Sequence, residues 1–286
     1  MPKNGPDNDI CAGADSYGVD MNPSTPLTRR RALGLIGAAG TAILAACSDP
    51  SGSTAVISND TLASSADTTA GAAATAGAAC ETIPEETAGP FPGDGSNGPD
   101  IRSVDGVVRR DIRTSIGSAS ATADGTPLTF TLRILDSANG CSPFAGAAVY
   151  AWHCDRDGNY SMYSPAAVNE NYLRGIQEAD ADGNVTFDSI YPGCYPGRWP
   201  HIHFEVFATL ADATGGGAPI ATSQLAFPAD ACAAAYTAAG YKTSASNLSR
   251  LSLEGDMVFA DGANQQTALT SGSPTSGFSA TLDVAI

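Results

Sequence analysis

Two of the three histidines in this chain are separated by a single residue, within the run Tyr195–Phe204. Side chains of an extended strand alternate between its two faces, so His201 and His203 are expected to point to the same side. Two imidazoles on one side can share a metal ion, although an H-x-H pair is equally typical of hydrogen-bonded histidines in an ordinary strand. The run therefore predicts a strand that offers two ligands to a candidate metal site.

The histidine count restricts the remaining ligands of such a site. His153 is the third histidine, so a copper-zinc dismutase site is excluded, and a three-histidine site would require His153. We interpret His153 as support for a strand instead, because it lies in a different kind of segment, Trp152–Ser161, which ends a strand and passes through an Asp-Gly turn. The same segment holds Tyr160. Tyrosinate is a hard anionic ligand that suits ferric iron, so two tyrosines and two histidines would form a ferric site.

Short strands are the elements that must position these residues. Apolar or alternating segments separated by Gly, Pro, Asp and Asn predict an all-β fold, a β-sandwich of mixed and antiparallel strands with long active-site loops. The expected strands are residues 128–135, 147–153, 184–187, 201–208, 220–226 and 277–286. Residues 231–240 suggest a short surface helix. Asp155–Gly158 and Asp180–Gly183 predict turns.

The first 47 residues have the pattern of an export signal. Thr28–Leu33 contains a twin arginine and precedes a short apolar run, which is typical of a Tat signal. Leu44–Cys47 looks like a bacterial lipobox, in which Cys47 would be lipidated. The alternative is an ordinary signal peptide in which Cys47 plays no part, and both interpretations predict export to the cell envelope. Met21 is a second candidate for the start of translation.

Composition divides the rest of the chain into a tether and a folded domain. Residues 48–79 are almost all Ser, Ala, Thr, Gly and Asp, with too few large apolar groups to form a core, which predicts a flexible linker. Residues 80–286 are expected to form one β-sandwich domain. The chain has 14 Lys and Arg against 30 Asp and Glu, with a formal charge of -16. A nucleic-acid-binding role is therefore excluded, because phosphate binding requires clustered cations.

Cysteines of the folded domain predict disulfides, since an exported protein enters an oxidising compartment. The five candidates are Cys80, Cys141, Cys154, Cys194 and Cys232. We expect most of them to pair and one to remain free, while the alternative role is buried apolar packing. The connectivity does not follow from spacing, but two of these cysteines, Cys154 and Cys194, sit beside suspected ligands and are candidates to lie close together.

A series of motifs in a characteristic order resembles the intradiol ring-cleavage dioxygenases, in particular exported members related to the protocatechuate and catechol enzymes. The resemblance covers residues 80–286. The motifs that carry it are Cys80–Phe91, Gly146–Ala147, Trp152–Cys154, Leu173–Gln177, Asp180–Gly183 and Tyr191–Tyr195.

This resemblance implies a ferric iron site and names its ligands. The iron ligands would be Tyr160, Tyr195, His201 and His203. Tyr191 is the alternative candidate for the second tyrosine ligand. We prefer Tyr195, because the spacing from Pro192 to Tyr195 matches the family pattern. Arg198 matches an arginine that lies beside the substrate and favours its carbanion-like form. Its alternative role is a surface salt bridge. Cys194 and Trp199 depart from the residues usual in the family, and we expect these departures to affect substrate preference more than metal binding.

The function implied by the resemblance is a non-haem Fe(III) enzyme that opens a catechol-type ring between its hydroxyl-bearing carbons. Both atoms of dioxygen would enter the product, a cis,cis-muconate-type diacid. Tyr195 would leave the metal when the catechol binds, and its phenolate would accept a substrate proton. Two alternatives remain open: a non-catalytic metal- or ligand-binding β-sandwich lipoprotein, and a zinc or copper enzyme that uses the H-x-H pair. The motifs specify neither one particular catechol nor an oligomeric state.

Overall fold

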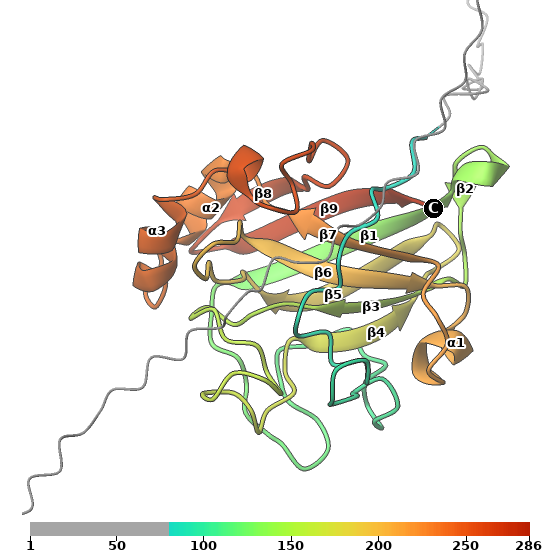
Figure 1. The fold of residues 1–286 in the computed structure, drawn as a ribbon, viewed down its shortest axis with the longest axis horizontal. Helices are drawn as coiled ribbons and strands as arrows, with labels where there is room; N and C mark the ends of the chain where they lie inside the picture. Colours follow the sequence, from blue (N-terminus) through green and yellow to red (C-terminus); the bar gives the residue numbers. More distant parts are fainter. Residues whose placement is uncertain (1–79) are drawn as a thin grey trace, which may run out of the picture. The chain divides into compact units, whose positions relative to one another are not determined.

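Two β-sheets pack face to face in the computed structural model, which describes residues 80–286 (Figure 1). The first sheet has the order β2-β1-β9-β8, with β5 also paired to β1, and the second has the order β4-β3-β6-β7. The strands are β1 (Pro127–Asp136), β2 (Ser142–Pro143), β3 (Ala148–Trp152), β4 (Arg174–Glu178), β5 (Asn184–Ile190), β6 (His201–Phe207), β7 (Ala221–Ala226), β8 (Leu269–Ser273) and β9 (Gly277–Ala285). The predicted signal segment and linker, residues 1–47 and 48–79, lie outside the described residues.

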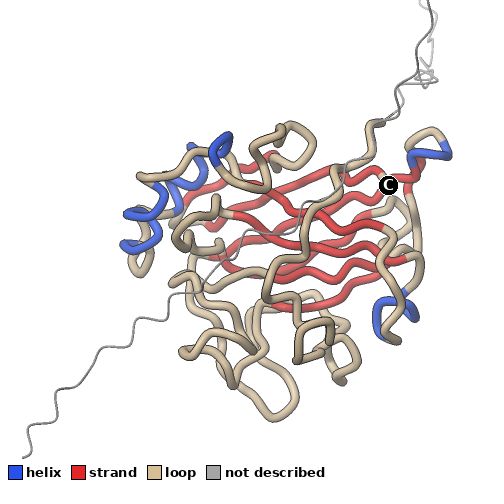
Figure 2. The backbone as a smooth tube through the Cα atoms, viewed as in Figure 1, coloured by secondary structure: helices blue, strands red, loops and turns tan. Residues whose placement is uncertain are grey.

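Strand pairing is antiparallel throughout the two sheets except between β1 and β9, which run parallel. The prediction of a β-sandwich with mixed and antiparallel strands is therefore confirmed. Long loops gather beside β4 at one edge of the sandwich (Figure 2). Within residues 80–286, no helix is both long enough and apolar enough to cross a membrane.

The core between the sheets follows from alternation along the strands. In β1, every second residue from Leu128 to Ile134 is buried, and β9 shows the same alternation from Phe278 to Val284. These side chains belong to one apolar cluster with Phe204 of β6, from the opposite sheet. Each fully buried side chain of this size stabilises the fold by about 1.5–3 kcal/mol. The alternation thus places one apolar side chain in two on the inner face of each sheet, and these side chains hold the two sheets together.

Strand β6 differs from its neighbours because all seven of its residues are buried. Ile202, Phe204 and Val206 belong to the core between the sheets. His201 and His203 alternate with them and therefore face the opposite side of the same sheet. That side is covered by a second apolar cluster, which includes Ile101, Val107, Tyr150, Trp152 and Tyr160. The histidines are thus enclosed by loops and not exposed to solvent.

Each of the six predicted strand segments overlaps an observed strand. The two-residue strand β2 was not predicted, and neither were the polar strands β4 and β8. Neither has an apolar alternation: β4 contains Arg174, Gln177 and Glu178, and β8 is mainly exposed. Both form because a neighbouring strand supplies hydrogen bonds. The predicted helix corresponds to α2 (Ala229–Ala235), which begins two residues earlier than expected. The other helical segments are α1 (Leu210–Thr214), α3 (Lys242–Leu248), η1 (Ser137–Asn139) and η2 (Leu253–Gly255).

The expectation that most cysteines pair is wrong for residues 80–286. Cys80 and Cys141 form a disulfide with a Cα–Cα distance of 5.8 Å, whereas the other three are buried free thiols. Cys154 and Cys194 do lie on adjoining segments, because the Cys154 thiol donates to the Gly193 carbonyl at 3.5 Å, but they are not bonded. Burial raises the pKa of the Cys194 thiol to about 12, so almost no thiolate exists to initiate disulfide exchange. These thiols pack as small apolar groups.

Replacing both Cys80 and Cys141 by alanine should lower the free energy of unfolding. The disulfide spans 61 residues, and closing a loop of that length stabilises a fold by at most about 4 kcal/mol. Urea unfolding of the double variant measures the loss, and thiol labelling of the unfolded parent should count three reactive cysteines among residues 80–286 under non-reducing conditions. Labelling of only one of them would contradict the observed pairing.

Candidate metal centre

Four side chains from three parts of the chain converge on the loop-covered side of β6. His201 and His203 are on β6, Tyr195 lies in the segment before it, and Tyr160 lies in the long loop between β3 and β4. The His201 and His203 Nε2 atoms are 3.1 Å apart, and the Tyr160 and Tyr195 hydroxyls are each 3.3 Å from His201 Nε2. The structure therefore brings together all four residues that the sequence predicts as ligands.

The distances from the His201 Nε2 to the other three donor atoms fit ligands of a single metal ion. Two ligands that each lie about 2.0–2.1 Å from one ion at a tetrahedral angle are about 3.3 Å apart. The His201 Nδ1 donates to the Trp199 carbonyl, which leaves Nε2 with a free lone pair directed at the cluster. His203 Nδ1 is buried without a hydrogen-bond partner among the described residues. Its Nε2 is thus the ring nitrogen that takes part in the cluster.

Burial shifts the pKa of every group in the cluster toward its neutral form. Desolvation raises the pKa of Tyr195 to about 12 and that of Tyr160 well above its usual value. Desolvation also lowers the pKa of His201 to about 3 and that of His203 well below its usual value. Neutral imidazoles are the form that binds metal. A bound cation would reverse the shift of the two phenols, because it favours the phenolate.

Tyr191, the competing tyrosine, is outside the cluster. Its side chain is fully buried in the core between the sheets, its hydroxyl donates to the Cys232 thiol at 3.4 Å, and its ring packs against Phe227 at 4.6 Å. Tyr195 is only partly buried. Tyr191 is thus a core residue, whereas Tyr195, four residues later, belongs to the cluster.

The Asp-Gly turn after β3 explains how Tyr160 reaches the cluster. The Asp155 carboxylate accepts hydrogen bonds from the backbone N–H groups of Asp157 and Asn159, at 2.9 and 2.8 Å. Gly158 adopts φ +88°, and a Cβ at this position would lie 3.0 Å from the Tyr195 Cβ. Glycine is therefore required both for the left-handed backbone and for the approach of the second tyrosine.

His153 does not belong to the cluster. It is buried, with Nε2 at 2.7 Å from the Ser189 hydroxyl and Nδ1 at 2.8 Å from the Cys154 carbonyl oxygen. Both ring nitrogens are occupied by protein partners, which agrees with its interpretation as a supporting residue. Among residues 80–286, no group of three or more His, Cys, Asp and Glu could hold a metal ion. The candidate centre therefore depends on its two phenols.

Arg198 is held in a buried ion pair, not in a surface salt bridge. Its Nε lies 2.9 Å from the Asp256 carboxylate, and the two side chains are 11% and 1% exposed. Its Nη2 donates to the Gln224 Oε1 at 2.7 Å. Asp256 also accepts the backbone N–H of Trp199 at 2.6 Å. Sequence reasoning missed Asp256 and Gln224, because both are remote in sequence and neither lies in a motif.

The segment Glu86–Gly89 forms a wall beside the centre. The Thr87 carbonyl accepts from Gln224 Nε2 at 2.8 Å, and a Cβ on Gly89 would lie 3.1 Å from the His203 Cε1. Sequence reasoning used this segment only as a marker of the family resemblance. Its place in the site is set by long-range contacts with β6 and β7.

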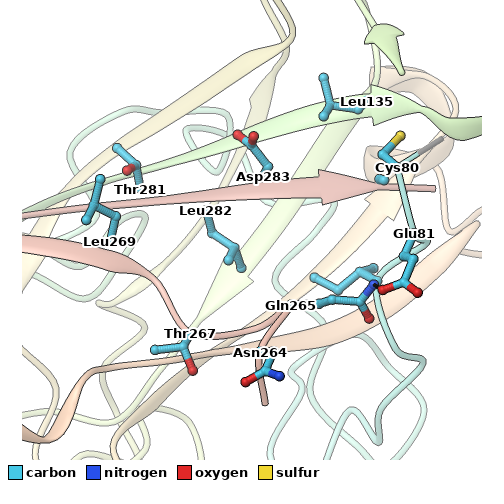
Figure 3. A pocket seen from close by; sticks show the side chains of 12 residues that line it. Cys80, Glu81, Leu135, Asn264, Gln265, Thr267, Leu269, Thr281, Leu282 and Asp283 are labelled. Carbon is cyan, nitrogen blue, oxygen red and sulfur yellow. Dashed lines mark hydrogen bonds between the residues drawn. The ribbon is translucent and has the colours of Figure 1, made fainter. Parts of the chain in front are cut away.

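A surface groove with a volume of about 770 Å³ lies elsewhere, between the segment that begins at Cys80 and the strands β8 and β9. Figure 3 shows Glu81, Gln265 and Asp283 around it. None of the four clustered residues lines this groove, so it is separate from the candidate metal centre.

Comparisons with known proteins agree on one family. A family model described as dioxygenase matches residues 109–238. A chlorocatechol 1,2-dioxygenase of Rhodococcus opacus is 38% identical over 71 residues, a stretch that covers 25% of this chain and only 27% of that enzyme.

Two solved structures share the fold over most of the described residues. An intradiol ring-cleavage dioxygenase from Tetranychus urticae is 26% identical with a TM-score of 0.56, covering 72% of this chain and 95% of that chain. The crystal structure of dioxygenase Tetur07g02040 is 26% identical with a TM-score of 0.57, covering 72% and 94%. With the motif order and the common β-sandwich, these matches show that the chain is similar to the intradiol ring-cleavage dioxygenases.

Proposed function

We propose that this protein is a non-haem Fe(III) dioxygenase that opens the ring of a catechol-type aromatic and forms a cis,cis-muconate-type diacid. The observation that carries the proposal is the convergence of two phenol oxygens and the His203 Nε2 on the His201 Nε2, each at 3.1–3.3 Å from it. Two hard anionic oxygens favour ferric iron over softer divalent ions. Similarity to the intradiol ring-cleavage dioxygenases supports the reaction class.

The four ligands have different surroundings, which suggests different roles. Tyr160, His201 and His203 are at most 2% exposed, whereas Tyr195 is partly exposed. Bound ferric iron would supply Lewis acidity toward the two oxygens of a catechol. Tyr195 is the ligand that can move aside for the substrate, and its phenolate oxygen can then accept a catechol proton. The three buried ligands anchor the metal.

Arg198 supplies a positive charge close to the cluster. Its charge lowers the pKa of Tyr195, in opposition to the larger effect of burial. Because Asp256 and Gln224 hold the guanidinium in place, it needs no reorganisation when negative charge develops on the bound substrate. We therefore assign electrostatic stabilisation to Arg198 and positioning of that charge to Asp256.

We also propose export and lipid anchoring through Cys47, with the enzyme at the bacterial cell envelope. The support is the twin-arginine and lipobox pattern of the sequence, together with the Cys80–Cys141 disulfide, which is typical of an oxidising compartment. Such an enzyme would act on catechols outside the cytoplasm.

Ferric reconstitution tests the centre directly. The iron-loaded protein should show a visible phenolate-to-iron charge-transfer band and consume oxygen with catechol. Tyr195→Phe should shift the band and lower kcat by about 100-fold or more, because it removes a ligand and a proton acceptor. Tyr191→Phe is the matched control and should retain both signals. A protein that stays colourless and inactive with ferric iron would overturn the proposal, while a coloured protein without oxygen uptake would favour a binding role.

Asp256→Asn should impair both stability and turnover. Breaking a buried ion pair costs about 3 kcal/mol or more, and a misplaced Arg198 should lower kcat/KM by about 10- to 100-fold. Burial alone would raise the pKa of Asp256, but hydrogen bonds from Trp199, Val258 and Arg198 hold it below its usual 3.8.

The stabilisation from Asp256 is therefore present above pH 3.8 and is lost as the pH falls through the lowered pKa. The difference in unfolding free energy between the parent and Asp256→Asn should shrink in the same range, as measured by urea unfolding from pH 7 to pH 3. A difference that is constant across this range would contradict the role of the ion pair.

Cys47→Ser tests the anchor in the native host. The parent should incorporate a radiolabelled fatty acid and partition into detergent, whereas the variant should incorporate none. Equal labelling of the two proteins would contradict lipidation of Cys47 and favour an ordinary signal peptide.

A further inference from the structure

We propose that Ser244, on the helix α3, is a positioning residue that holds the two tyrosine ligands at a fixed spacing. This inference rests on the proposed function and deepens it. The segments that carry the tyrosines are Cys154–Tyr160 and Tyr191–Tyr195, and each ends on one of the ligands. Ser244 binds the backbone of both segments.

The second of these segments is fixed by side chains that border the helices α2 and α3. The Tyr191 carbonyl accepts a hydrogen bond from the Tyr241 hydroxyl at 2.7 Å. The Pro192 carbonyl accepts one from the Tyr236 hydroxyl at 3.0 Å. Tyr236 directly follows α2, and Tyr241 directly precedes α3. The chain is therefore anchored to this helical region before it reaches the ligand Tyr195.

Helix α3 itself binds both backbone groups of Cys194, the residue directly before Tyr195. The Cys194 N–H donates to the Ser244 hydroxyl at 3.0 Å, and the Cys194 carbonyl accepts from the Asn247 Nδ2 at 2.8 Å. Cys194 and Ser244 are only 2% and 1% exposed. Without the serine hydroxyl, the Cys194 N–H would therefore be buried and would have lost its acceptor, which is unfavourable.

The same hydroxyl also binds the segment that carries the other tyrosine. Ser244 Oγ donates to the Arg156 carbonyl at 2.9 Å, and Arg156 precedes Tyr160 by one turn of the chain, the Asp-Gly turn. A serine hydroxyl can donate and accept at once, because it has one proton and two lone pairs. A single side chain thus connects the backbone before Tyr160 with the backbone before Tyr195.

The two segments also contact each other directly. The Gly193 N–H donates to the Asp155 carbonyl at 3.0 Å, and the Cys154 thiol donates to the Gly193 carbonyl at 3.5 Å. A Cβ at Gly193 would lie 2.6 Å from the carbonyl oxygens of both Asp155 and Arg156. This close approach brings the rings of the two tyrosine ligands to a centroid distance of 5.8 Å.

The chain after Tyr195 has different surroundings. Pro196 and Gly197 are exposed, and a Cβ at Gly197 would meet no atom within 4 Å. Tyr195 is therefore anchored on its N-terminal side and open on its C-terminal side. Its side chain can move away from the cluster while the backbone at Cys194 stays in place, so the phenol returns to the same position.

Ser244→Ala tests this role in the full-length protein. Without metal, the amide of Cys194 should exchange with deuterium at least about tenfold faster, because its hydrogen bond is lost. With ferric iron, competition with a chelator should show an affinity about tenfold lower than that of the parent, the size typical of losing a group that orients a ligand. The phenolate-to-iron band should shift as well, because the two phenols are no longer held at one spacing.

Ser115→Ala is the matched control. The Ser115 hydroxyl is also buried, accepts the Asn171 N–H at 3.0 Å and donates to the Glu170 carboxylate at 2.7 Å. Its loss removes a similar pair of hydrogen bonds at a place that borders neither tyrosine ligand. Urea unfolding should show a loss of stability in both serine variants, whereas the band and the iron affinity should change only in Ser244→Ala.

Asn247→Ala provides a second test that does not open the interior. Asn247 is only partly buried, so this variant is expected to fold even where Ser244→Ala does not. It removes the other hydrogen bond from α3 to Cys194. The band should shift in the same direction as in Ser244→Ala, by a smaller amount.

The outcomes separate this inference from the function on which it rests. A band and an iron affinity that Ser244→Ala and Asn247→Ala leave equal to those of the parent would overturn the positioning role while leaving the ferric centre intact. An equal change in Ser115→Ala would also overturn it, because a general loss of stability would then explain the effect. A parent protein that binds no ferric iron would overturn the proposed function and this inference with it.

Discussion

Strand β6 is buried on both of its faces, because no residue from His201 to Phe207 is exposed to solvent. Its apolar residues fill the core between the sheets, and its histidines enter a second interior that loops enclose. The other parts of the site depend on this constraint. A slip of one residue in the pairing of β6 would exchange the two sets and place imidazoles in the core. The register of β6 with β3 and β7 therefore decides whether a metal centre can exist.

Enclosure of the histidines has an electrostatic consequence. Burial keeps the phenols protonated and the imidazoles neutral, so the cluster carries no charge by itself. Such a group of donors is suited to a cation, which converts the phenols into anionic ligands. The stacking of His203 on Trp152, with ring centroids 5.0 Å apart, restricts its ring orientation. The site is thus prepared by packing before any metal binds, as preorganisation requires.

The charged side chains around the centre differ in the partners that compensate them. Arg198 forms an ion pair with Asp256, and the guanidinium of Arg174 donates hydrogen bonds to neutral acceptors. The Glu86 carboxylate accepts a hydrogen bond from Gln266. The guanidinium of Arg198 is thus held in a fixed position by Asp256 and Gln224.

Local sequence determined much of this protein. Period-two alternation predicted six of the strands, and the H-x-H spacing placed two imidazoles on one face. The Asp-Gly turn indicated where the loop that carries Tyr160 begins. These features could be predicted because they depend on neighbours along the chain. Only the tertiary structure decided the rest. The polar strand β4, the free state of three cysteines, and the partnership of Arg198 with Asp256 depend on residues far apart in sequence, and no local pattern records which distant group will arrive beside them.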